Sequence, residues 1–388
     1  MGSDATDDGA VMTALFQQEW NNVAFTSFIA VVTASIMFIV MRLRRTPAEP
    51  TVTELNIYPI KSCGPMKVQL AMVTDIGFSY DRFAQVSDSA GNYLTPRDKR
   101  NVKLFHVKPR IIESNDGSNI HLDLTFNDGK IKSSYKIENL NEAIENKSAT
   151  KDVTPMIGPK VKCVDVGDGV SSWLSNVTGI ADCRLTAIGP QYLRYVEENP
   201  DQGEPVPFIE ETSVKNKEDE GGSRKPVVSL ADEAPFLLTS SSSLQDLNAR
   251  LKARGKAPVD MQRFRPNIVV SGRNLMPWEE DTWKRIRIGG IEFHVWQRCG
   301  RCSMTTIDRD TLERGPEPLA TLSTFRERAN GMRNFGMHMV PVWNSSMEHA
   351  ETSTVQVRDK IEVLEYCEER LKEWKRLFSP SSSDEAKE

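Results

Sequence analysis

The residues with the clearest chemical potential lie between positions 296 and 310, which read WQRCGRCSMTTIDRD. Cys302 directly follows Arg301, and Arg298 lies four residues before it. Nearby positive charge favours the thiolate form of a cysteine over the thiol. Because a thiolate is a nucleophile and a ligand for soft metals, this context predicts a reactive or metal-binding sulfur at Cys302.

Cys299 and Cys302 also have the CxxC spacing found in zinc sites. A closed zinc site needs four protein ligands, however, and the sequence contains no second CxxC pair. The spacing alone therefore leaves two alternatives open. The pair is structural, or it joins His294 in a catalytic zinc site with three protein ligands.

Three strands are expected to position these residues. Alternating apolar residues on both sides of Gly289-Gly290 predict a β-hairpin over residues 286–295, and the cysteines follow where its second strand leaves the sheet. RFRPN (263–267) leads into the apolar strand IVV (268–270), and YPIKSCG (58–64) ends another strand in a lysine and a hydroxyl. Functional side chains are often presented in this way, on loops held by rigid strands.

Taken together, these segments resemble the MOSC-domain proteins, and within them the mitochondrial amidoxime-reducing component group. The resemblance extends from Thr51 to Leu364, and its most specific parts are IYPIKSCG, YDRF, FRPNIVVSG and CGRCSMTTID. It implies a mostly β (α+β) fold. The N-terminal β domain is expected at residues 51–180, and a MOSC β-barrel domain with peripheral helices at residues 181–365.

The resemblance also implies a role for individual residues. Cys302 matches the cysteine whose sulfur ligates molybdenum, and Asp232 matches an acidic position near the metal. Asp232 is a candidate proton relay, or it orients a neighbouring arginine or backbone amide. The positions that match the pterin and phosphate site of the molybdenum cofactor are Lys61, Ser62, Arg82, Arg265, Asn267 and Arg301. Cationic and hydrogen-bonding side chains of this kind suit a phosphorylated pterin.

The implied activity is the reduction of N-hydroxylated compounds such as amidoximes. Electrons are expected from a cytochrome b5-type haem protein and its NADH-dependent reductase, because the chain has no Rossmann fingerprint of its own. Two other functions stay open: a sulfur carrier with a persulfide on Cys302, and a non-catalytic module that binds the molybdenum cofactor.

Two departures from the family concern the surroundings of the site. Residues 308–312 read DRDTL where relatives usually carry DPDTG, so the turn is expected to change. Glu233 stands where relatives more often have a small hydroxyl residue, which adds negative charge beside an anionic cofactor.

The N-terminal part carries a second strong pattern. After a tail at residues 1–22, Val23–Met41 is uncharged, mostly apolar and long enough to span a bilayer as a helix. Acidic residues precede it and Arg42, Arg44 and Arg45 follow, which predicts a membrane anchor with the large C-terminal part in the cytosol. A buried core helix is the alternative. The resemblance implies the outer mitochondrial membrane, and the endoplasmic reticulum is not distinguished from it.

The rest of the sequence is consistent with an intracellular globular protein. The formal net charge of the 388 residues is −5, which leaves no basic footprint for nucleic acid, and six scattered cysteines fit a reducing compartment. Local patterns predict strands at 120–126, 337–342 and 355–364, helices at 171–177, from Ser243 and from Pro318, and a loop at 216–224. A C-terminal helix and a disordered tail are expected over residues 366–388.

Overall fold

The computed structural model describes residues 47–114, 119–145, 150–157, 160–188, 194–195, 227–342 and 353–378. All of these except Pro47 and Ala48 belong to one unit, Glu49–Glu388. The expected anchor at 23–41, the loop at 216–224 and the tail beyond 378 lie outside the described residues. Within the described ranges, no helix is both long enough and apolar enough to cross a bilayer.

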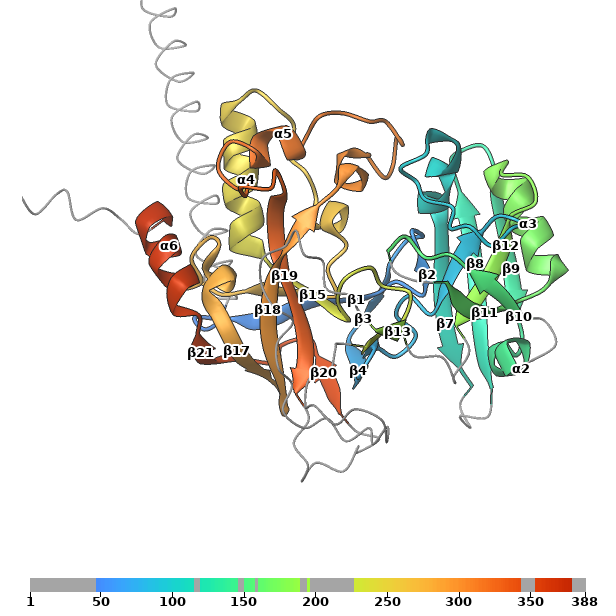
Figure 1. Cartoon of the computed structure of the whole chain (residues 1–388), viewed down its shortest axis with the longest axis horizontal. Coiled ribbons are helices and arrows are strands. Elements are labelled where there is room, and N and C mark those ends of the chain that lie inside the picture. Colours follow the sequence, from blue (N-terminus) through green and yellow to red (C-terminus); the bar gives the residue numbers. More distant parts are fainter. Residues whose placement is uncertain are drawn as a thin grey trace, which may run out of the picture. The chain divides into compact units, whose positions relative to one another are not determined.

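The largest element is an eight-stranded sheet in the order β21-β17-β18-β19-β15-β16-β1-β3 (Figure 1). Its strands are β1 (Thr51–Ile57), β3 (Met66–Val68), β15 (Phe236–Ser240), β16 (Ile268–Ser271), β17 (Trp283–Ile288), β18 (Ile291–Arg301), β19 (Arg333–Val342) and β21 (Ile361–Tyr366). The expected hairpin is confirmed, because β17 pairs antiparallel with β18 and Ile288 lies opposite Ile291 across Gly289-Gly290. Gly289 has a φ of 58°, which a glycine adopts without steric cost.

The first strand of the chain completes this sheet. β1 pairs antiparallel with β16, so that Leu55 lies opposite Ile268. The chain near β21 returns to the start of β1, where the amide of Ile361 donates to the carbonyl of Pro50 at 2.9 Å. The two ends of the strand order therefore meet, in a barrel-like closure. The strands at residues 51–78 share a core with the second region, although the sequence was expected to form one N-terminal domain from 51 to 180.

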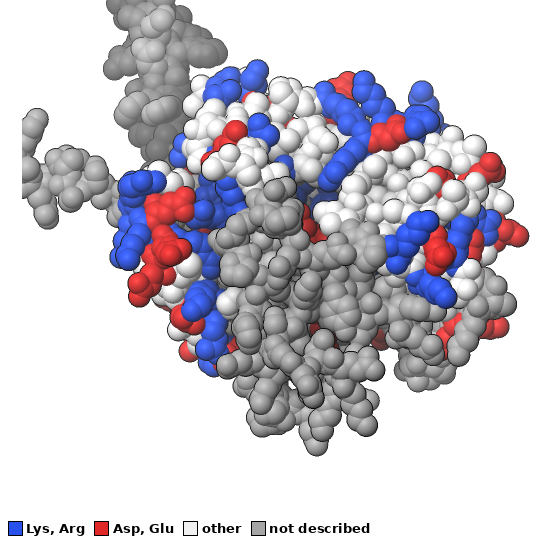
Figure 2. All heavy atoms as spheres, in the orientation of Figure 1, with Lys and Arg blue, Asp and Glu red and all other residues white. Residues whose placement is uncertain are grey.

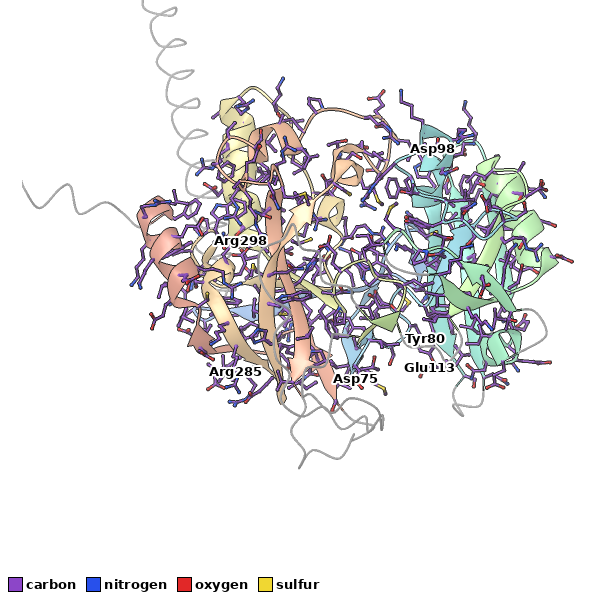
Figure 3. All side chains as sticks on the ribbon, viewed as in Figure 1. Asp75, Tyr80, Asp98, Glu113, Arg285 and Arg298 are labelled. Carbon is purple, nitrogen blue, oxygen red and sulfur yellow. The ribbon has the colours of Figure 1, made fainter. Side chains whose placement is uncertain are left out.

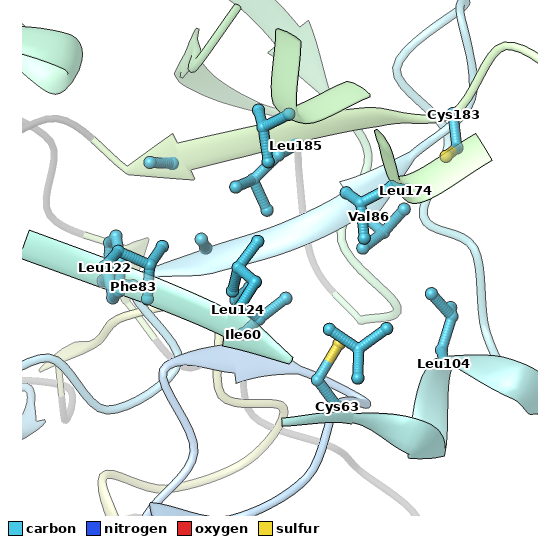
Figure 4. Close-up of a cluster of buried hydrophobic side chains, with 14 of the residues drawn as sticks. Ile60, Cys63, Phe83, Val86, Leu104, Leu122, Leu124, Leu174, Cys183 and Leu185 are labelled. Atoms are coloured by element: carbon cyan, nitrogen blue, oxygen red, sulfur yellow. The ribbon is translucent and has the colours of Figure 1, made fainter. Parts of the chain in front are cut away.

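A second group of strands surrounds its own core. The five-stranded sheet β10-β11-β12-β6-β2 consists of β2 (Ile60–Lys61), β6 (Ala84–Ser87), β10 (Thr150–Val153), β11 (Val161–Asp165) and β12 (Arg184–Ile188). The three-stranded sheet comprises β7 (Val107–Glu113), β8 (Ile120–Asn127) and β9 (Lys132–Ile137). Alternate apolar residues of β8, such as Leu122 and Leu124, meet Leu174 of helix α3 (Asp168–Thr178) in this core (Figure 4).

Shorter elements connect and cover these sheets. The small strands are β4 (Leu70–Thr74), β5 (Gly77–Phe78), β13 (Arg194–Tyr195), β14 (Val227–Val228) and β20 (Thr354–Gln356). The other helices are α2 (Leu140–Glu145), α4 (Ser241–Ala253), α5 (Leu319–Leu322) and α6 (Glu368–Phe378), with 3-10 helices η1 (Lys99–His106), η4 (Met261–Phe264), η5 (Glu279–Thr282) and η6 (Ser303–Thr306). Charged side chains of both signs are interspersed on the described surface seen in Figure 2.

Most expected elements are present, with shifts at their ends. Helix α4 begins two residues earlier than expected, because the hydroxyl of Ser240 caps it by accepting from the amide of Ser243 at 3.1 Å. The single strand expected at 355–364 is wrong. A turn around Arg358, whose φ is 83°, divides it into β20 and β21.

Candidate cofactor site

Two of the predicted ligands, Arg82 and Arg265, lie against one aromatic ring. Their guanidinium carbons are 4.7 and 4.2 Å from the centroid of the Tyr58 ring. Tyr58 is buried, and burial raises its pKa to about 12, so the ring stays neutral between the two cations. Arg265 also donates to the carbonyl of Cys63 at 2.7 Å.

Three predicted ligands share an uncommon backbone conformation. Ser62, Arg82 and Arg265 have φ values of 71°, 49° and 55°, in the left-handed region. A residue other than glycine costs about 1–3 kcal/mol in such a conformation and persists there only when tertiary contacts impose it. Strained residues of this kind cluster at functional sites. The backbone geometry therefore supports the assignment of these three positions to one site.

A polar network fixes the orientation of Arg82. Its Nη1 pairs with the buried carboxylate of Asp81 and donates to Oδ1 of Asn267 at 3.3 Å. Asp81 accepts in turn from the amide of Tyr58 at 2.8 Å. Asn267 is buried, and its Oδ1 also accepts from the amide of Leu237 at 3.2 Å. Asn267 therefore acts here by positioning Arg82.

Lys61 and Asp232 form an ion pair across the two halves of the described chain. The Lys61 side chain is 6% exposed and that of Asp232 is 38% exposed, so the carboxylate is the partner that solvent and solutes can reach. The ammonium of Lys61 lies 4.8 Å from the ring centroid of Tyr93, whose hydroxyl contacts that of Ser62. Burial raises the pKa of Tyr93, and the nearby charge of Asp232 raises it further.

Cys302 is the first residue after β18 and is half-buried. Arg301 does not turn toward its sulfur, contrary to what the sequence suggests. Instead, Nη1 of Arg301 lies 2.7 Å from Sγ of Cys299, and Nη2 donates to the carbonyl of Phe264 at 2.7 Å. Cys299 lies within β18, not after it. Burial raises the pKa of the Cys299 thiol to about 11.

Arg298 lies outside the site, although its position suggests an influence on Cys302. Its guanidinium pairs with Asp281 at 3.0 Å and with Glu373 of α6 at 2.7 Å (Figure 3). Arg298 therefore links the end of β18 to η5 and α6. The cation that does interact with Cys302 is Arg97.

No motif in the sequence pointed to Arg97, which precedes η1. Arg97 donates a side-chain hydrogen bond to Cys302. Burial lowers the pKa of Arg97, but the interactions with Cys302, Asp232 and Tyr93 outweigh burial and raise it. Arg97 is exposed, so it lies beside the sulfur at a place that solutes can reach. Sequence reasoning also missed Tyr58, Tyr93 and Arg309. Tyr58 lies within the IYPIKSCG motif, and Arg309 directly follows the CGRCSMTTID motif.

Several cations of the site have no acidic partner among the residues that the structure describes. Among the described residues, neither Arg265 nor Arg309 has a carboxylate at ion-pair distance. Withdrawal from water lowers the pKa of both, to about 9 for Arg309, and their mutual repulsion lowers the pKa of Arg309 further. The Nε atoms of Arg301 and Arg309 are buried without a hydrogen-bond partner in the described structure. Such a set of donors fits an anionic ligand rich in acceptors.

The structure does not bring His294 together with the two cysteines. His294 lies in the middle of β18, opposite Arg285 and Val340. Among the described residues, the group that could hold a metal with three side chains consists of Glu233, Cys299 and His338. The described structure therefore does not assemble the set of His294, Cys299 and Cys302 that was considered from the sequence.

The structure describes both positions that the sequence analysis expects to differ from relatives, the segment 308–312 and Glu233. The turn at 308–312 is retained, since Oδ1 of Asp308 accepts from the amides of Asp310 and Thr311 at 3.0 and 2.9 Å. Leu312 occupies its last position with a φ of 60°, where a glycine would be unstrained. Glu233 lies near His338, with 3.5 Å between Oε2 and Nδ1.

Comparison with known families matches both halves of the chain. The model of the MOSC N-terminal beta barrel domain matches residues 49–181, and that of the MOSC domain matches residues 225–362. The matched segments contain every predicted ligand: Lys61, Ser62 and Arg82 in the first, and Asp232, Arg265, Asn267, Arg301 and Cys302 in the second.

Individual relatives agree with the family models. Mitochondrial amidoxime-reducing component 1 of Mus musculus is 31% identical over 300 residues, which are 74% of each chain. Molybdenum cofactor sulfurases of Danio rerio and of Oryza sativa subsp. japonica are 28% and 30% identical over 298 and 288 residues. The matched region spans only 32% and 31% of those two proteins. The chain therefore belongs to the family of MOSC-domain proteins that includes mitochondrial amidoxime-reducing component 1.

Proposed function

We propose that this protein is a molybdenum-dependent oxidoreductase that reduces N-hydroxylated compounds, amidoximes among them, at the site of Cys302. The observation that carries the proposal is that two half-buried arginines, Arg265 and Arg309, have no carboxylate at ion-pair distance among the described residues. Tyr93 connects them to the half-buried Cys302, because it interacts with Arg265 and with Arg97, the neighbour of Cys302. An anionic cofactor with a phosphate and a polar ring would satisfy these donors. The similarity to an amidoxime-reducing component supports the choice of substrate.

The residues of the chain divide the work of holding that cofactor. Arg265 and Arg309 offer positive charge without a carboxylate, which suits the phosphate. Lys61, Ser62 and Arg82 offer further donors, Asn267 positions Arg82, and Arg301 has a buried Nε to satisfy. The thiolate of Cys302 is the proposed ligand of molybdenum. The bound cofactor supplies two-electron redox chemistry and an acceptor for the oxygen of the substrate.

Residues of the chain must deliver the protons that the reaction consumes. Reduction of an N-hydroxyl group to N–H consumes two electrons and two protons and releases the oxygen as water. Asp232 is the proposed relay, because its carboxylate is partly exposed while Lys61 holds it in place. Arg97 is proposed to orient the substrate hydroxyl, since it is exposed and interacts with Cys302.

Electrons are proposed to come from a cytochrome b5-type haem protein served by an NADH-dependent reductase. The absence of a Rossmann fingerprint in the sequence supports an external donor. The apolar segment Val23–Met41 is proposed to anchor the protein in a membrane with the catalytic part in the cytosol. The name of the mouse relative supports a mitochondrial membrane, and the outer one is proposed.

A sulfur-carrier role is the second candidate, because several relatives that match this region are molybdenum cofactor sulfurases. In that role Cys302 carries a persulfide and the purified protein contains no molybdenum. Elemental analysis therefore separates the two functions. Mass spectrometry of the peptide that contains Cys302 detects the additional sulfur atom.

The decisive experiment compares Cys302→Ser with Cys367→Ser in the full-length chain, purified in detergent. Both cysteines are half-buried, but Cys367 lies at the start of α6 and outside the site. With a reduced viologen dye as electron source, benzamidoxime reduction by the wild type and by Cys367→Ser should be equal. Cys302→Ser should fall to the rate of the dye alone. An active Cys302→Ser protein, or a wild type that contains persulfide and no molybdenum, would overturn the proposal.

A further inference from the structure

Three side chains with different donor atoms converge beside the cofactor site. Glu233 follows β14, Cys299 belongs to β18 and His338 to β19, and one ligand atom of each lies within 4.8 Å of the other two. The closest measured pair is Nδ1 of His338 and Oε2 of Glu233, at 3.5 Å.

We propose that Glu233, Cys299 and His338 bind a zinc ion that is separate from the molybdenum site. Sulfur, imidazole nitrogen and carboxylate oxygen together are typical of zinc, which binds them at about 2.0–2.3 Å. In a tetrahedral site such bonds place ligand atoms about 3.3–3.8 Å apart. The pair at 3.5 Å has this separation already, and the others need to close by at most about 1 Å.

The charges of the three groups also suit a divalent cation. A carboxylate and a thiolate balance the two positive charges, and the imidazole contributes a neutral nitrogen. The ring of His338 is buried and its Nδ1 faces the carboxylate of Glu233 at 3.5 Å, so one ring nitrogen is directed to the same place as the carboxylate. The proton that a metal must displace is that of the Cys299 thiol, to which Arg301 already offers positive charge.

The surroundings resemble the outer shell of a metal site. Cys299 and His338 are each 6% exposed, whereas the Glu233 side chain is 22% exposed, which leaves an approach for the ion. Arg301 lies 2.7 Å from Sγ of Cys299, and neighbours of this kind orient the ligands of metal sites. Gln297 lies 3.3 Å from Nδ1 of His338, so its amide must turn away when that nitrogen binds the ion. Three protein ligands leave a fourth position for water or a solute.

The proposed zinc site is connected to the proposed molybdenum site through the backbone. Glu233 directly follows Asp232, and Cys299 lies three residues before Cys302. Zinc would therefore fix two of the segments that carry the proposed proton relay and molybdenum ligand. This role is one of position, and zinc binding does not depend on the presence of molybdenum.

The first test measures metal in the full-length protein. After removal of metals with a chelator and loading with zinc, the wild type should retain about one zinc per chain. Glu233→Gln, Cys299→Ser and His338→Gln should each weaken zinc binding at least about tenfold. Matched controls, Cys163→Ser and His121→Gln, alter a buried cysteine and a histidine elsewhere and should bind as the wild type does. Cys302→Ser should also keep its zinc.

The second test uses the wild type alone, so it holds even if a variant does not fold. Zinc loading should protect Cys299 from alkylation while Cys367 reacts at an unchanged rate, as peptide mass spectrometry reports. Cobalt loading should give a thiolate charge-transfer band. Equal zinc binding by the three ligand variants and the controls, or a Cys299 alkylation rate that zinc does not change, would overturn the proposal.

Discussion

At the scale of single residues, Arg265 and Arg309 are unusual. Both are withdrawn from water, and neither has a carboxylate at ion-pair distance among the described residues. Sequence alone cannot separate them from structural arginines, since Arg265 and Arg298 both lie in recognisable motifs. In the fold, Arg298 meets two carboxylates, whereas Arg265 meets a carbonyl and an aromatic ring. An isolated charge of this kind disfavours folding unless a ligand compensates for it.

Arg265→Met should therefore have opposite effects on binding and stability. Loss of a charge-assisted hydrogen bond should lower cofactor affinity by about 1.5–3 kcal/mol, or about 10- to 150-fold. The cofactor-free variant should be at least as stable to heat as the cofactor-free wild type, because the uncompensated charge is gone. Molybdenum content and thermal melting measure the two effects.

Arg273→Met is the matched control, because Arg273 is exposed and lies outside every motif. It should change neither molybdenum content nor melting. A cofactor-free Arg265→Met protein that melts well below the wild type would indicate a structural arginine instead. Arg358, which the pattern of a continuous last strand would suggest as a control, is unsuitable because it forms a turn at positive φ.

At the scale of elements, the turn at 308–312 shows how a departure from the family is accommodated. Asp308 accepts two amide hydrogen bonds and also pairs with Arg263 at 2.7 Å, so the turn is fixed at its start. These contacts keep the backbone of Leu312 in a conformation that favours glycine. The same turn carries Arg309, which has no carboxylate at ion-pair distance within the described part of the chain.

Leu312→Gly should stabilise the protein. Relief of a left-handed non-glycine residue is worth about 1–2 kcal/mol, and part of this is offset by the greater freedom of glycine in the unfolded chain. The expected rise in melting temperature is about 2 °C. Asp310→Gly, in the same turn but at an ordinary φ, should lower it. A lower melting temperature for Leu312→Gly would show that side-chain packing of Leu312 outweighs its backbone strain.

Local patterns predicted elements well where the signal is local. The Gly289-Gly290 hairpin, the strand β16 and the apolar alternation of β8 follow from residue types within ten positions of one another. The ligand positions came from the resemblance. What could not be predicted depends on contacts between segments distant in the sequence, such as the hydrogen bond from Arg301 to the carbonyl of Phe264 and the position of Arg97 beside Cys302.

At the scale of the molecule, the site is assembled from segments far apart in the chain. Arg82 and Asn267 are separated by 185 positions, and Lys61 and Asp232 by 171. The pairing of β1 with β16 brings the segment after β1 next to the segment before β16. No local sequence pattern encodes this pairing.

Deletion of residues 1–45 should release the protein from membranes without loss of molybdenum. The proposed anchor lies at 23–41, and the first proposed ligand is Lys61. Fractionation of cells after a high-salt wash should find the full chain in the membrane pellet and the truncated chain in the supernatant, with equal molybdenum per chain. A truncated chain that stays in the pellet would mean that another segment anchors the protein.

The pairing of β1 with β16 also determines when β1 can fold during translation. The hydrogen bond between Thr53 and Val269 joins residues 216 positions apart, and a ribosome adds about 5–20 residues per second. β1 must therefore wait about 10–45 s for its partner, with its edge open to other chains. The strands from β2 to β12 are complete by residue 188 and can pair earlier. Under the proposed function, insertion of the cofactor must follow release of residue 302 from the ribosome, so the cofactor would have to be supplied to a folded or nearly folded chain.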